Sequence, residues 1–150
     1  MRELIRLFQN KQKAIETILF IAWCYVLLRL TLLSRTPKPL RIFRLDFLYE
    51  LRKFSMGSED GLYYIDLFIK NILLFVPCGL VMPWKKKWKQ VTLIGLFLSG
   101  TIEIIQYITR LGECEIDDII ANTLGASIGY ELYVVANKIL NIGRGRNEKA

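Results

Sequence analysis

The stretch IEIIQYITRLGECEIDDIIANTLG, residues 102–125, decides the fold because it joins two strongly apolar runs through a short polar turn. Each run is part of a longer apolar segment. Segments of this kind occupy residues 14–33, 66–83, 91–108 and 118–140. A helix needs about 20 apolar residues to cross the ~30 Å hydrocarbon core of a bilayer. The sequence therefore predicts a single all-α domain, residues 1–150, that crosses a membrane four times.

The composition agrees with a membrane protein without requiring one. Of the 150 residues, 53% are apolar and 23% are charged. A soluble helical bundle is the main alternative, and we disfavour it because the apolar runs carry almost no amphipathic stripe. The first run could also be a cleaved signal peptide. Its length and the poor cleavage site at Ser34-Arg35-Thr36 favour a retained helix.

Basic residues predict the orientation of the chain. Lys and Arg gather in both terminal tails and in the short turn Trp84–Lys89, which lie on one side if there are four spans. The positive-inside rule then places both termini in the cytoplasm of a multi-pass cell-membrane protein. The basic residues behind the net charge of +7 act mainly to retain their segments on the cytoplasmic side, where they also contact anionic lipid. No nucleic-acid partner is therefore expected.

The outer connection, residues 34–65, is also basic, although acidic residues dilute its charge. Within it, the segment RIFRLDFLYELRKF, residues 41–54, mixes aromatic and basic side chains. This pattern favours either an interfacial helix on the outer leaflet or a partly ordered loop packed over the mouth of the bundle.

Several kinds of site are disfavoured by the residue types present. The chain has no histidine, which removes the commonest zinc ligand and the commonest general base. Cys24, Cys78 and Cys114 form no disulfide framework. Phosphate-binding glycine loops and the nucleophile-elbow motif are also missing. We therefore expect no cofactor and no resident metal.

Polar and small residues form one stripe on each of the last two spans. At about 100° per residue, one third of the third span's circumference holds Ser99, Gly100, Glu103, Gln106, Tyr107 and Arg110. An arc of about 40° on the fourth span holds Asp118, Asn122, Gly125, Gly129 and Ala136. The GxxxG pattern of Gly125 and Gly129 lets another helix approach closely. That helix belongs either to this chain or to a second copy in a homo-oligomer.

Polar residues from all four spans also share a depth, roughly 3–8 Å below the outer boundary at 1.5 Å per residue. Burying an ionised group near the bilayer centre costs about 2.5–3.5 kcal/mol. Ion pairs such as Glu103–Arg29 or Glu103–Lys70 could offset this cost and hold the bundle together. The interpretation we favour is a hydrated, outward-facing pocket for a polar ligand. Its candidate ligand-binding residues are Arg29, Lys70, Asn71, Glu103, Gln106, Arg110, Asp117, Asp118 and Asn122.

A family resemblance rests on many of the same residues. The motifs that carry it are NILLFVPCGL (Asn71–Leu80), ExxQ (Glu103–Gln106), Arg110, the pair Asp117-Asp118, and NTLGAxxG (Asn122–Gly129). In this order and spacing, roughly over residues 28–135, the sequence resembles the VanZ-like family of small bacterial membrane proteins. The resemblance implies an association with low-level resistance to teicoplanin and related glycopeptides in Gram-positive bacteria. It implies no agreed biochemical activity.

Three hypotheses of function follow. In the first, which we favour, the pocket binds a cell-wall precursor, a lipid headgroup or the antibiotic, with Arg29, Lys70 and Arg110 contacting phosphate or carboxylate groups. In the second, an enzyme acts on an envelope lipid or glycan. Glu103 and Asp118 would serve as acid and base, or a set of Glu115, Asp117 and Asp118 would hold a hard cation such as Mg²⁺. The third is a transporter component, which would require oligomerisation.

Overall fold

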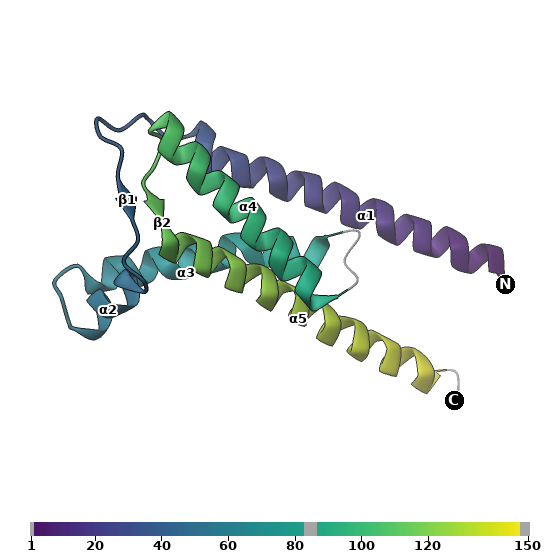
Figure 1. The fold of residues 1–150 in the computed structure, drawn as a ribbon. Coiled ribbons are helices and arrows are strands. Elements are labelled where there is room, and N and C mark those ends of the chain that lie inside the picture. Colours follow the sequence, from purple (N-terminus) through teal and green to yellow (C-terminus); the bar gives the residue numbers. More distant parts are fainter. Residues whose placement is uncertain (1, 83–86, 148–150) are drawn as a thin grey trace.

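The computed structural model describes residues 2–82 and 87–147 and is helical almost throughout (Figure 1). By length and composition, the described residues contain helices able to cross a membrane at Asn10–Leu33, Gly61–Val81, Trp88–Thr109 and Ile116–Ile139. The predicted all-α, four-span fold is therefore confirmed. The predicted end of the second span at Pro83, and Trp84–Lys86 of the basic turn, lie outside the described residues.

The helices run back and forth between two ends of the molecule. In chain order, the elements are α1 (Arg2–Leu28), the π-helical turn η1 (Arg29–Leu33), β1 (Phe43–Arg44), α2 (Tyr49–Ser55), α3 (Gly61–Val81), α4 (Trp88–Thr109), β2 (Cys114–Glu115) and α5 (Ile116–Asn147). Figure 1 shows the start of α1 and the end of α5 at one end of the bundle. The strands and α2 lie at the opposite end, which we call the loop end.

Glycines bring α3 and α5 into close contact. A Cβ atom at Gly125 would collide with the carbonyl oxygen of Ile72, and one at Gly129 would collide with that of Val76. In return, Gly79 of α3 lies against the backbone of α5. Small residues at such a crossing allow the two helix backbones to pack directly. The glycine face predicted to pack against a helix is thus used within the chain and is not available to a second copy.

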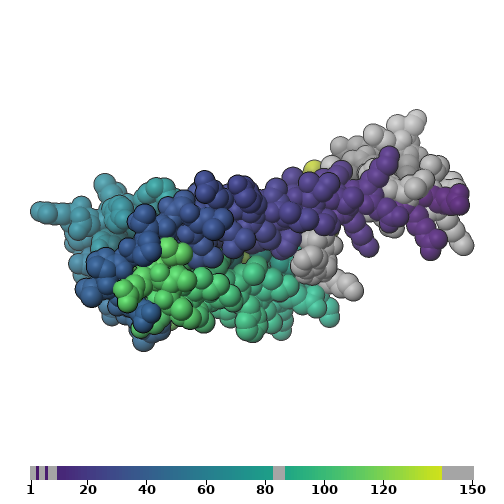
Figure 2. Space-filling model, turned by 90° about the horizontal axis from the view of Figure 1, so that it is seen from above, coloured from purple at the N-terminus to yellow at the C-terminus, as the bar shows by residue number. Residues whose placement is uncertain are grey.

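Helix α1 packs on the bundle through only part of its surface. Trp23 and Leu27 are buried against Phe75, and the indole Nε1 of Trp23 donates a hydrogen bond to the carbonyl oxygen of Leu74 at 2.8 Å. Ile15, Ile18 and Ile21, on other faces of this helix, are exposed, as expected of a helix that faces lipid. Figure 2 shows α1 lying along one face of the molecule.

The segment after α1 folds back over the turn between α4 and α5. Strand β1 pairs in parallel with β2, so that Phe43 lies opposite Cys114 and Arg44 opposite Glu115. In Figure 2, the blue residues that follow α1 lie against the green turn. Helical structure in residues 41–54 is restricted to α2, because Phe43 and Arg44 are extended to pair with β2. The outer connection therefore combines a short helix with a loop packed over the loop end.

Candidate functional site

A polar pocket of about 380 Å³ lies at the loop end, within the size range of small-molecule sites. Its walls come from the outer connection, the first half of α3, the α4–α5 turn and the first turn of α5. The lining residues are Arg35, Lys38, Arg44, Glu50, Tyr63, Tyr64, Leu67, Asn71, Glu113, Glu115 and Asp118. Basic and acidic side chains thus share one pocket at the end of the apolar spans.

The basic side chains are partly neutralised by an acidic residue of the α4–α5 turn. Lys38 Nζ and Arg44 Nη2 each lie 2.9 Å from a carboxylate oxygen of Glu113. Partial burial opposes ionisation of Glu113, but hydrogen bonds from Lys38 and Glu115 outweigh it and lower its pKa. Arg44 Nη1 is also 3.2 Å from Glu115. Arg35, by contrast, makes no ion pair with a carboxylate among the residues that the structure describes.

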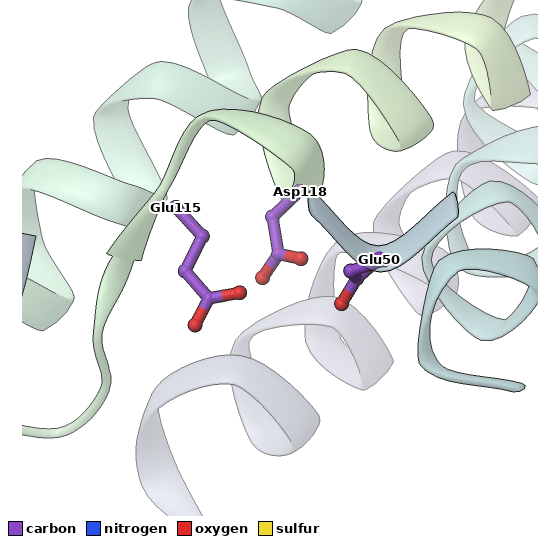
Figure 3. Close-up of side chains that lie close together, drawn as sticks. All are labelled: Glu50, Glu115 and Asp118. Atoms are coloured by element: carbon purple, nitrogen blue, oxygen red, sulfur yellow. The ribbon is translucent and has the colours of Figure 1, made fainter. Parts of the chain in front are cut away.

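Three carboxyl groups meet in the pocket: those of Glu50 from α2, Glu115 from β2 and Asp118 from the first turn of α5. One oxygen from each lies within 4.8 Å of the others, and Figure 3 shows Asp118 between the other two side chains. Burial, reinforced by repulsion from Asp118 and Glu115, raises the pKa of Glu50 to about 8. Burial and the charge of Asp118 raise the pKa of Glu115 to about 7. The surroundings therefore do not stabilise all three carboxyl groups in their ionised form together.

Glu50 is the most isolated member of this acidic cluster. Its relative exposure is 1%, and its Oε2 atom has no hydrogen-bond partner among the described residues. A buried carboxylate is normally paired or hydrogen-bonded, because removing it from water is costly. The structure thus places an unsatisfied acceptor beside two further carboxylates.

Asp117 positions Glu50 and lies outside the pocket lining. Its buried carboxylate accepts hydrogen bonds from the backbone N–H groups of Leu48 at 2.6 Å and Glu50 at 3.0 Å. Leu48 precedes α2 and provides no side-chain cap of its own, so Asp117 caps this helix from a distant part of the chain. The sequence hypothesis of a cation set with Asp117, Asp118 and Glu115 needs correction, because Glu50 takes the place of Asp117.

Among the other predicted site residues, Asn71 and Asp118 line the pocket and contact each other. Asn71 Nδ2 donates to Asp118 Oδ1 at 2.6 Å. This bond joins the middle of α3 to the start of α5 and leaves the second oxygen of Asp118 for another partner.

Three further predicted residues are buried and make contacts between segments. Glu103 accepts the backbone N–H of Glu115 at 3.1 Å, so it fixes β2 against α4. Gln106 Nε2 donates to the carbonyl oxygen of Thr31 at 2.8 Å, and Asn122 Nδ2 donates to Ser99 Oγ at 2.8 Å. For these residues, the geometry agrees with the hypothesis that polar contacts hold the bundle together.

The three basic residues predicted at the site lie away from the pocket lining. Arg29 and Lys70 are exposed, and Lys70 pairs with Asp66 on its own helix. Arg110 is exposed with a φ of 63°, and its carbonyl oxygen accepts the backbone N–H of Lys38 at 2.7 Å. Glu103 forms no ion pair with Arg29 or Lys70 among the described residues, so those predicted pairs are wrong.

The pocket residues that sequence reasoning did not select come mostly from the outer connection and the α4–α5 turn. They are Arg35, Lys38, Arg44, Glu50, Tyr63, Tyr64, Leu67 and Glu113. For the six that lie in residues 34–65, the one signal was the basic and aromatic character of this connection, which marked a region without selecting positions. Leu67 and Glu113 lie outside it and had no such signal.

The fold and the pocket together define a small, multi-pass helical membrane protein with a charged pocket at one end of its bundle. A model of the VanZ/LLP1 family matches residues 8–137, and the chain belongs to this family. It is also similar to Protein VanZ of Enterococcus faecium, with 37% identity over 78 residues. That alignment covers 49% of this chain and 47% of the relative, so the chain spans about half the length of the curated protein it matches. No solved structure matches the chain.

Proposed function

We propose that this VanZ-like protein binds the phosphate-bearing headgroup of an envelope lipid, with lipid-linked cell-wall precursors as the foremost class. Through this binding, it contributes to tolerance of teicoplanin-type glycopeptides. The observation that carries the proposal is the position of the charged pocket where α3 and α5 begin. A ligand there has its polar group at the membrane surface and its chain beside the spans.

The lining chemistry suits such a ligand. Arg35 is exposed and Lys38 is half exposed, so both offer N–H donors at the rim of the pocket. Guanidinium groups bind phosphate through two parallel hydrogen bonds, and ammonium groups bind it as compact charges. Tyr63 and Tyr64 lie on the first turns of α3, where aromatic residues commonly mark the membrane–water boundary.

The link to antibiotic tolerance comes from the family. VanZ-like proteins are associated with low-level teicoplanin resistance, and the relative matched here is named Protein VanZ. A membrane protein that holds a lipid-linked precursor changes how much of that precursor is open to other molecules at the cell surface. We infer an outward-facing pocket from the predicted cytoplasmic position of both termini.

The test combines binding with tolerance. The double variant Arg35→Ala/Lys38→Ala removes two rim cations, and Arg52→Ala removes an exposed cation of the same connection that does not line the pocket. Binding of a polyprenyl monophosphate to detergent-purified protein should weaken at least about tenfold in the double variant, because charged hydrogen bonds contribute about 1.5–3 kcal/mol each. The Arg52 variant should bind like the parent protein.

In a deletion strain, the same double variant should fail to restore teicoplanin tolerance while Arg52→Ala restores it. Equal binding by all three proteins would refute the lipid-headgroup proposal. Direct binding of teicoplanin that depends on Arg35 and Lys38, without lipid binding, would make the drug the ligand instead.

A further inference from the structure

We propose that Glu50, Glu115 and Asp118 bind a divalent, oxygen-preferring cation such as Ca²⁺ or Mg²⁺, which bridges the protein to the phosphate of the bound headgroup. The bridging role rests on the proposed function, whereas cation binding itself does not. This proposal departs from the sequence-based expectation of no metal.

The first argument is geometric. The candidate oxygens of the three carboxyl groups lie within 4.8 Å of one another. Two ligands on opposite sides of Ca²⁺ are about 4.6–5.2 Å apart, and about 4.0–4.2 Å apart around Mg²⁺, from metal–oxygen distances of about 2.3–2.6 Å and 2.0–2.1 Å. Three carboxylates in the observed arrangement can therefore contact one ion, with Mg²⁺ requiring the tighter approach.

The second argument is the unsatisfied acceptor on Glu50. This side chain is almost fully buried, its Oε2 atom has no hydrogen-bond partner among the described residues, and it faces the two other carboxyl groups (Figure 3). Arg44 reaches Glu115 at 3.2 Å, but no ion pair joins a cation to Glu50 among the residues that the structure describes. A hard cation can bind a buried carboxylate oxygen that has no hydrogen-bond donor from the protein, and so offset the cost of its burial.

The third argument is that contacts within the chain hold all three carboxyl groups in place. The hydrogen bonds from Leu48 and Glu50 to the carboxylate of Asp117 fix the start of α2. Pairing of β1 with β2 fixes Glu115 in the same way. Asn71 holds one oxygen of Asp118 and thereby orients the side chain. Each carboxylate is thus held in position by a separate contact. Residues around metal sites often orient the metal ligands in this way.

Placed there, a cation explains how an acidic pocket accepts an anion. The rim residues Arg35 and Lys38 attract the phosphate, and the open coordination positions of the ion take its oxygens. Magnesium and calcium commonly join carboxylates to phosphate groups in this way. The cation would also connect α2, β2 and α5, and so rigidify the loop end.

The test uses the full-length protein in detergent, stripped with a chelator and titrated with the metal alone. Terbium serves as a luminescent substitute for Ca²⁺, since Tyr64 lines the pocket and can sensitise its emission. Calorimetry with Ca²⁺ and Mg²⁺ checks the natural ions. We expect saturable binding at or below about 1 mM, the weak end of the range for extracellular calcium modules.

The matched variants are Glu50→Gln, which keeps the side-chain shape and removes the charge, and Glu59→Gln, which changes an exposed carboxylate of the same connection. Glu50→Gln should weaken binding at least about tenfold, and Glu59→Gln should leave it unchanged. Asp118→Asn provides a second cluster variant in case Glu50→Gln does not fold. Saturable binding that is equal in the parent protein and in both cluster variants, or no saturable binding up to about 10 mM, would overturn the cation site.

Failure of this inference can be told apart from failure of the proposed function. Cation binding without any binding of a polyprenyl phosphate would leave the site in place and refute the lipid ligand. Lipid binding that is unchanged by the chelator would retain the proposed function and remove the bridging ion.

Discussion

Replacing Asp117 with alanine should loosen the start of α2 while leaving the four spans folded. Its carboxylate accepts two backbone N–H groups, from Leu48 at 2.6 Å and Glu50 at 3.0 Å. A hydrogen bond to a charged group contributes about 1.5–3 kcal/mol. Because water can solvate the freed amides once the loop opens, we expect the substitution to lower the free energy of local opening by about 2 kcal/mol. At 1.4 kcal/mol per factor of ten, this loss corresponds to about 30-fold more frequent opening.

Hydrogen–deuterium exchange over residues 47–56 measures this opening directly. Exchange of the Leu48 and Glu50 amides should accelerate about 30-fold in Asp117→Ala, from the same ~2 kcal/mol. Asp117→Asn, which keeps one acceptor oxygen, should show a smaller increase. Asp66→Asn is the control, because Asp66 is exposed and forms its ion pair with Lys70 of the same helix, α3. Unchanged exchange in Asp117→Ala would refute the role of Asp117 as the cap of α2.

Two other predictions concern the bundle and its orientation. Gly129→Ala places a methyl group against the carbonyl oxygen of Val76 and should destabilise the detergent-solubilised protein by about 1–3 kcal/mol in thermal or denaturant unfolding. The control Gly100→Ala has open space around its Cβ and should be neutral or stabilising by up to about 1 kcal/mol. Equal effects of the two substitutions would contradict the close packing of α3 against α5. In a variant without the native cysteines, Glu59→Cys should react with a membrane-impermeant maleimide on intact cells. Lys87→Cys should react only after permeabilisation, and the reverse pattern would invert the topology.

The four spans could be predicted because their signal is local. Apolar runs of bilayer length have few alternatives to a membrane helix, and the spacing of Gly125 and Gly129 identified a helix-packing face that α3 occupies. The pocket residues Asn71 and Asp118 were also accessible to sequence reasoning, since both are polar residues near the outer ends of the predicted spans 66–83 and 118–140.

The rest of the pocket could not be predicted because it depends on pairing between distant segments. Depth fixes the height of a side chain along the bundle but leaves open its direction around the helix axis. Arg29 and Lys70 therefore shared a predicted layer with Glu103 and yet are exposed. Glu50 and Glu115 meet because two-residue strands pair in parallel, and such short strands carry no recognisable pattern. Likewise, nothing in the sequence shows that Asp117 accepts backbone groups of the outer connection.

Photocrosslinking in the living membrane tests whether the loop-end pocket receives a phosphate-bearing lipid headgroup. A photoreactive amino acid replaces Tyr63, which lines the pocket, or its neighbour Leu62, which is 74% exposed and does not. Mass spectrometry then identifies the captured molecules. We expect a lipid-linked phosphate to be enriched at position 63 over position 62, and this enrichment to disappear in Arg35→Ala/Lys38→Ala. Capture of the same lipids in the same proportions at both positions would contradict it.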